Sequence, residues 1–162
     1  MLFGGSYRGI LIGLGVTGCV MQVIIPGQMT IPFAALSFGI CTALGLGKSK
    51  ASAGIMLTAA IAALLPQIII YEPGIYFRVG IAQPATGPIT IGWIEYFAKN
   101  CVTLLFLFGT ILAYSFIFKP DRPLNGKKYF QEQYALLGKM TIEEKKGAVA
   151  CLLLLVALLT LD

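Results

Sequence analysis

The 162-residue chain is 57% hydrophobic and only 12% charged, and it has a net charge of +5 with no histidine. This composition is typical of membrane proteins, and the lack of histidine excludes histidine-based acid–base catalysis. The positive charge does not indicate nucleic-acid binding, because seven of the twelve basic residues lie between Lys119 and Lys146, next to apolar runs. Such a basic segment is typical of the cytoplasmic side of a membrane protein.

The sequence has no pattern typical of a catalytic or metal-binding protein. The cysteines are far apart, in apolar surroundings and without metal-ligand spacing: Cys19, Cys41, Cys101 and Cys151. A nucleophile elbow and a phosphate-binding loop are also missing from the sequence. We therefore expect neither an enzyme nor a bound cofactor, and we interpret the cysteines as small buried hydrophobic residues.

The first two apolar runs predict a re-entrant hairpin over residues 10–46. Ile10–Ile25 has 16 residues, about 24 Å of helix, and Thr30–Leu46 is of similar length. Both are shorter than the roughly 20 residues that cross a bilayer. Non-helical backbone survives in hydrocarbon only where protein or water surrounds it. We therefore expect a break within Ile25–Thr30, at a tip enclosed by protein; an ordinary turn between two helices is the alternative.

A second interrupted segment follows the basic turn Gly45–Lys50. Ala51–Tyr71 is long enough to span a membrane, but Pro66-Gln67 lies inside it. Proline lacks a backbone donor and frees a carbonyl one turn earlier, so residues 51–71 are predicted to form a broken span. A simple packing kink at Pro66 is the alternative.

The next segment is predicted to be external, followed by a further span. Glu72–Pro88 contains several prolines and glycines and is interpreted as a loop. Thr90–Lys99 has apolar residues at helical spacing with Trp93 and Tyr96, which is typical of an interfacial helix. Asn100–Phe118 is an uninterrupted apolar span that leads into the basic segment assigned to the cytoplasm. Residues 72–99, at the other end of this span, are therefore assigned to the outside.

The remaining residues predict a cytoplasmic linker and the beginning of another span. Residues 119–146 are polar, and Thr141 with Glu144 has the spacing of a capping box. The helix that begins there is expected to continue through Gly147 into residues 147–162, which form an incomplete span. We therefore expect the chain to be a fragment of a longer multi-pass protein of the cell membrane.

The order of these segments resembles the divalent anion/sodium symporter family. The most specific feature is Leu137–Lys145, similar to the Leu-Gly-x-Met-Thr/Ser-x-Glu-Glu-Lys linker between that family's inverted repeats. The resemblance implies an all-α polytopic membrane protein, part of an inverted-repeat ion-transporter fold, with residues 1–118 from the first repeat. It also implies secondary active transport of a dicarboxylate, citrate or sulfate coupled to a cation, with the second repeat missing and a homodimer at full length.

The resemblance also implies where the ligands bind. The family's hairpin tip carries Ser-Asn-Thr, and the matching positions here are Gly27-Gln28-Met29. Together with the interruptions at the tip and at Pro66, this match makes Gln28 and Thr30 candidates for binding the anion, and Gly27, Gln28 and Pro66 candidates for binding Na⁺ through carbonyl or carboxamide oxygens. Independently of the family, interrupted helices offer bare N–H groups to anions and bare carbonyls to cations.

Two other functions fit parts of the sequence. A small accessory or scaffold membrane protein without transport activity would also use the Gly- and Ala-rich runs for packing. The membrane subunit of a binding-protein-dependent dicarboxylate system would share the hairpin, but the Leu137–Lys145 linker argues against it.

Overall fold

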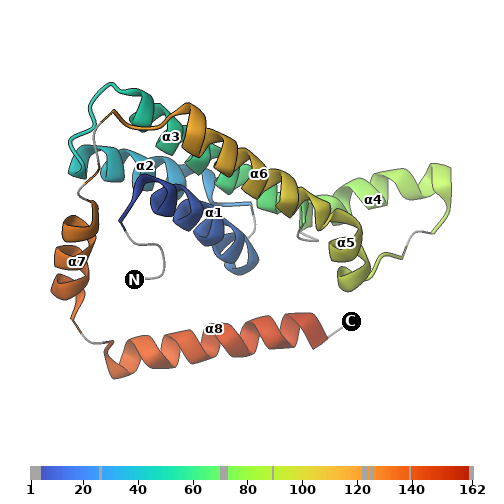
Figure 1. The fold of residues 1–162 in the computed structure, drawn as a ribbon. Helices are drawn as coiled ribbons and strands as arrows, with labels where there is room; N and C mark the ends of the chain where they lie inside the picture. The colour runs from blue at the N-terminus through green and yellow to red at the C-terminus, as the bar shows by residue number, and fades with distance from the viewer. Residues whose placement is uncertain are drawn as a thin grey trace.

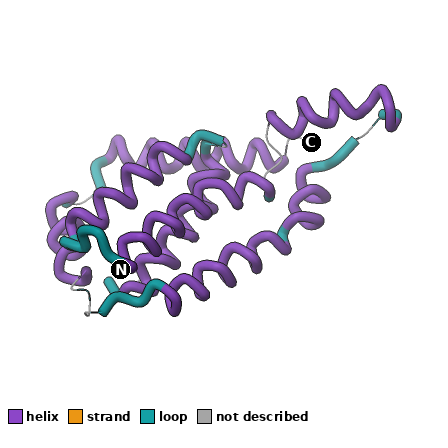
Figure 2. The backbone as a smooth tube through the Cα atoms, turned by 90° about the horizontal axis from the view of Figure 1, so that it is seen from above, coloured by secondary structure: helices purple, strands orange, loops and turns teal. Residues whose placement is uncertain are grey.

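The computed structural model describes residues 5–25, 27–69, 73–88, 90–121, 124, 126–138 and 140–160. Every regular element among these residues is helical, which confirms the all-α prediction (Figures 1 and 2). The elements are α1 Tyr7–Ile24, α2 Thr30–Ala43, α3 Lys50–Leu64, the 3₁₀ helix η1 Leu65–Ile68, α4 Pro73–Thr86, α5 Trp93–Asn100, α6 Val102–Ile117, α7 Gly126–Leu137 and α8 Ile142–Thr160.

Helix α3 lies at the centre of the bundle and packs against α1, α2 and α6 (Figure 1). It runs parallel to α1, since the Tyr7 hydroxyl donates to the Ala51 carbonyl near the start of both helices and Gln22 reaches Ala63 near their ends. The buried apolar residues belong mainly to these helices, and they include Leu11, Leu14, Phe33, Ile55, Ala59, Leu107 and Ile111. Small side chains on α3 allow α1 to approach closely.

The two arms of the predicted hairpin are helical, and the described residues between Ile24 and Thr30 leave helical geometry, as predicted. The expected enclosure of the tip by protein is wrong for most of the described tip, because Met29 is buried but Ile25, Gln28 and Thr30 are exposed. The first arm is longer than expected, because α1 begins at Tyr7. The Ser6 side chain caps it by accepting from the Gly9 N–H at 3.2 Å. Both arms pack against α3.

The interruption at Pro66 is milder than a full break. The α-helix ends at Leu64 and continues directly as the 3₁₀ turn η1, which contains Pro66. A 3₁₀ turn at a helix end accommodates the missing donor without exposing many backbone groups. Tyr71, at the end of the predicted segment, lies outside the described residues.

The predicted loop over Glu72–Pro88 is wrong, because α4 occupies Pro73–Thr86. Pro73 stands at the first helical position, where a proline ring is well tolerated. Pro84 lies in the last turn, so its missing N–H disturbs only the end of the helix. Both prolines therefore lie in the end turns of α4, where they are compatible with a helix.

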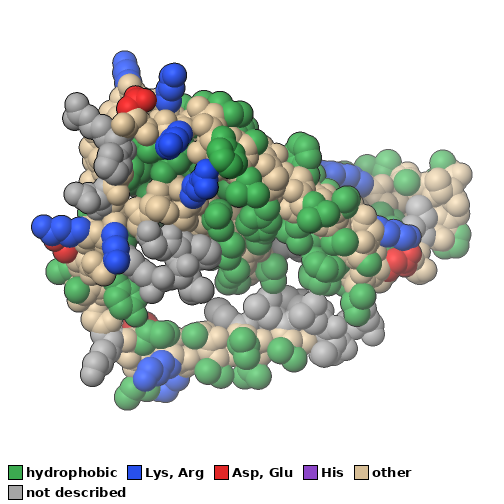
Figure 3. Space-filling model, in the orientation of Figure 1, with side chains coloured by type: hydrophobic (Ala, Val, Ile, Leu, Met, Phe, Trp, Pro, Cys, Tyr) green, Lys and Arg blue, Asp and Glu red, His purple; other side chains and the backbone are tan. Residues whose placement is uncertain are grey.

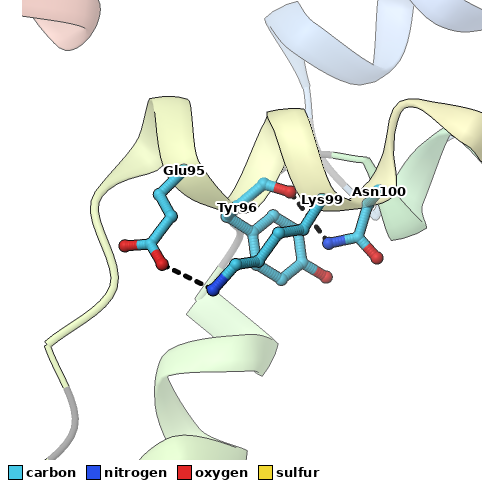
Figure 4. A network of polar contacts seen from close by, with 4 residues as sticks. All are labelled: Glu95, Tyr96, Lys99 and Asn100. Atoms are coloured by element: carbon cyan, nitrogen blue, oxygen red, sulfur yellow. Dashed lines mark hydrogen bonds and ion pairs between the residues drawn. The ribbon is translucent and has the colours of Figure 1, made fainter.

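The short helix predicted over Thr90–Lys99 is present as α5. Its polar face carries an ion pair between Lys99 and Glu95, with Nζ 2.5 Å from Oε1, and Asn100 Nδ2 donates to the Tyr96 carbonyl (Figure 4). An exposed pair at this spacing stabilises a helix by about 0.3–0.5 kcal/mol. Helix α6 follows with a bend of 41°. Its buried Leu107, Ile111 and Ser115 form one stripe, and its other faces are largely exposed and apolar.

The linker contains a helix that the sequence did not predict, α7, and the predicted capping box starts α8. The Thr141 N–H donates to Glu144 Oε2 at 2.7 Å, and the Glu144 N–H donates to Thr141 Oγ1 at 3.2 Å. Helix α8 lies along the edge of the bundle in Figure 1, and its described side chains are mostly exposed.

Within the part of the chain that the structure describes, two helical segments are long and apolar enough to cross a membrane: Tyr7–Ile24 and Lys50–Ile68. The bent pair α5 and α6 adds a third if it forms one span. Apolar residues are also exposed widely on the outer faces of α2, α6 and α8. A surface of this kind is typical of a protein that is surrounded by lipid, so the chain has the character of a membrane protein.

Replacing Gly18 tests the close contact between α1 and α3. A Cβ added at Gly18 would lie 2.3 Å from the Ala62 carbonyl oxygen, whereas one at Gly39 on α2 would meet nothing within 4 Å. We expect Gly18→Ala to lower the free energy of unfolding by about 1–3 kcal/mol through overpacking. Gly39→Ala should leave it unchanged or raise it by up to about 1 kcal/mol. Unfolding in detergent with increasing SDS measures both, and equal stability of the two variants would contradict the close contact.

Candidate functional site

The hairpin tip and the end of α3 are joined by one buried side chain, Gln22 of α1. Its exposed fraction is 0%. Its Nε2 donates to the Ala63 carbonyl of α3 at 2.5 Å, and its Oε1 accepts from the Gly27 N–H at 2.9 Å. The carboxamide thus fixes the position of the tip relative to the end of α3. The two interruptions predicted from the sequence lie at one place in the fold.

The proline of η1 explains why α3 presents carbonyl oxygens here. Pro66 has no N–H, so it cannot donate to the Ala62 carbonyl one turn earlier. This oxygen lies against Gly18 of α1, whose missing side chain permits the approach. The Ala63 carbonyl bonds to Gln22. Two successive carbonyls of α3 therefore face α1 next to the tip.

The tip also presents backbone donors. Gly27 has φ +77°, a left-handed conformation that glycine adopts without strain. Met29 is the N-cap residue of α2, and no side-chain hydrogen bond caps this helix. The first-turn N–H groups of Thr30 and Ile31 therefore have no intrahelical acceptor. Bare N–H groups and the positive end of the helix dipole attract anions.

The predicted site residues differ in their surroundings. Gln28 and Thr30 are exposed at the start of α2, Gly27 is half-buried, and Pro66 is buried. The Pro66 carbonyl accepts from the Ile69 N–H at 3.1 Å. Their roles in binding an anion or Na⁺ stay predictions.

Sequence reasoning missed Gln22, the residue that joins the site. The available signal was a lone carboxamide inside the apolar run Cys19–Ile25, since a buried amide needs hydrogen-bond partners. Thr58 of α3 is a second polar residue that was missed. It is 0% exposed, and its Oγ1 has no hydrogen-bond partner among the described residues.

No protein-family model, curated protein or solved structure matches this chain.

Replacing Gln22 tests the contact between the tip and α3. Gln22→Leu removes both hydrogen bonds and leaves the Ala63 carbonyl and the Gly27 N–H unpaired. We expect a loss of about 1–3 kcal/mol of unfolding free energy for each group that stays buried. Gln28→Leu, at an exposed glutamine of the same tip, should change stability by less than about 0.5 kcal/mol. SDS unfolding in detergent measures the difference, and similar losses for both variants would mean that Gln22 does not bridge the two segments.

Proposed function

We propose that this chain supplies half of the binding site of a secondary transporter for a small divalent anion, coupled to a cation. The observation that supports this best is the Gln22 bridge, which holds a helix N-terminus and a pair of carbonyls from a proline-interrupted helix in one place. Transporters commonly bind their substrates and coupling ions between such interrupted helices. A dicarboxylate, citrate or sulfate is the proposed substrate class.

The anion would bind at the start of α2. The first-turn N–H groups offer donors, and the Gln28 carboxamide and the Thr30 hydroxyl extend from exposed positions beside them. These groups are neutral, so they would hold the anion through hydrogen bonds and the helix dipole. A divalent anion gains more from such an arrangement than a monovalent one.

The cation would bind on the other side of Gln22. The Ala62 and Ala63 carbonyl oxygens are hard ligands of the kind that Na⁺ prefers, and the cation would compete for the Ala63 oxygen with Gln22 Nε2. Gln22 also accepts a hydrogen bond from the Gly27 N–H of the tip. A cation that coordinates these oxygens would therefore shift Gln22 and, with it, the position of the tip. The two binding events would thereby be coupled through one side chain, as cation-driven transport requires.

A scaffold protein remains the second candidate, because the close contact between Gly18 and Ala62 serves packing as well as transport. The two functions differ in one respect. A transporter needs the start of α2 to be accessible to a ligand, whereas a scaffold has no use for a ligand there.

Protection of an introduced cysteine distinguishes the two functions. In a background without the native cysteines, Thr30→Cys places a thiol at the first turn of α2, and Thr42→Cys places one near the other end of the same helix. We expect succinate, citrate or sulfate to slow maleimide labelling of the cysteine at position 30 in Na⁺ buffer and less so in choline buffer. Labelling at position 42 should not change. Equal labelling rates at position 30 with and without anion would contradict the proposed site.

A further inference from the structure

A groove at the other end of the bundle has the lining of a lipid site. It lies between the end of α2, the α2–α3 turn and the first turns of α3, and it has a volume of about 990 Å³. This size is at the upper end of the range typical of ligand sites in proteins. Lys and Arg side chains gather over this end of the bundle in Figure 3.

The lining of the groove divides into an apolar and a cationic part. Phe38 of α2 and Met56 of α3 contribute large apolar side chains that are 65% and 45% exposed, and Cys41 and Ala53 lie beside them. Lys48 and Lys50 contribute the charges at the turn. A ligand that matches both parts has an apolar chain and an anionic head.

The turn holds the two lysines in place through its backbone. Helix α2 ends in a Schellman motif, with the Leu46 N–H donating to the Cys41 carbonyl and the Gly45 N–H donating to the Thr42 carbonyl, both at 3.0 Å. Ser49 then caps α3 by accepting from the Ser52 N–H at 3.2 Å. Both ends of the turn are thus fixed, with Lys48 and Lys50 on either side of the cap.

The lysines are available for an anionic partner. Both are exposed. The ion pairs among the described residues join other lysines to acids: Lys99 to Glu95, Lys128 to Glu132 and Lys146 to Glu143. A smaller cavity of about 200 Å³ continues from Lys50 toward Lys119 and Asp121 after α6. Lys119 and Asp121 thus add one cationic and one acidic side chain to the rim of the groove.

We propose that this groove binds an anionic phospholipid, with its phosphate at Lys48 and Lys50 and an acyl chain along Phe38 and Met56. Lys50 begins a candidate membrane span, so the lysines stand at the end of an apolar helix, where lipid headgroups lie. Basic pockets between helices at the cytoplasmic surface bind such headgroups. The inference rests on the membrane character of the chain and not on the proposed transport activity.

Lipid binding to the purified protein in detergent tests this proposal, measured by native mass spectrometry with dioleoylphosphatidylglycerol as the probe. We expect this lipid to bind more tightly than dioleoylphosphatidylcholine. Lys48→Gln with Lys50→Gln should weaken its binding about 30-fold. The control Lys127→Gln with Lys128→Gln removes the same charge from α7 and should have little effect. Ala53→Trp, at an exposed position in the groove, should weaken binding with the lysines intact.

Three results would overturn the proposal. Equal effects of the two lysine pairs would mean that the lipid responds only to net charge. Unchanged binding in Ala53→Trp would mean that no acyl chain lies in the groove. Displacement of the lipid by millimolar inorganic phosphate would identify a site for a free anion.

Discussion

The arrangement of the candidate site depends on the carboxamide of Gln22. An amide buried in an apolar helix is costly unless both its donor and its acceptor are satisfied. In this fold the donor finds a carbonyl of α3 and the acceptor finds the Gly27 N–H of the tip. The first of these bonds is available because α3 approaches α1 closely at Gly18. The Gln22 side chain thus supplies a hydrogen-bond partner to the Ala63 carbonyl of α3 and to the Gly27 N–H of the tip, which would otherwise both be unpaired.

The chain breaks were predictable because their causes are local. Proline and glycine mark the tip between α1 and α2, Pro66 marks the change to η1, and Thr141 with Glu144 forms the capping box of α8. Helices α4 and α7 were not predicted from the sequence. The prolines of Glu72–Pro88 were interpreted as loop signals, whereas Pro73 and Pro84 lie in the first and last turns of α4, where a missing N–H costs little. Residues 119–146 were interpreted as a polar linker, and α7 occupies Gly126–Leu137 within it.

The site was predictable only in its parts. The tip and Pro66 each indicate free backbone groups from sequence alone, but nothing local places them together. The contact between Gln22 and Ala63 joins residues 41 positions apart, and it depends on the parallel packing of α1 on α3. The lipid groove has the same origin: its lysines are visible in the sequence, but the apolar lining comes from two helices that the turn folds against each other.

The most direct test of the central claim is the distance between the tip and the end of α3 in a lipid bilayer. Spin labels at Gln28 and Ile68, both outside the buried core, allow it to be measured by double electron–electron resonance in nanodiscs. The bridge predicts one narrow distance distribution that broadens when Gln22 is replaced by Leu. A distribution that is already broad with Gln22 present, or one that Gln22→Leu leaves unchanged, would contradict the account.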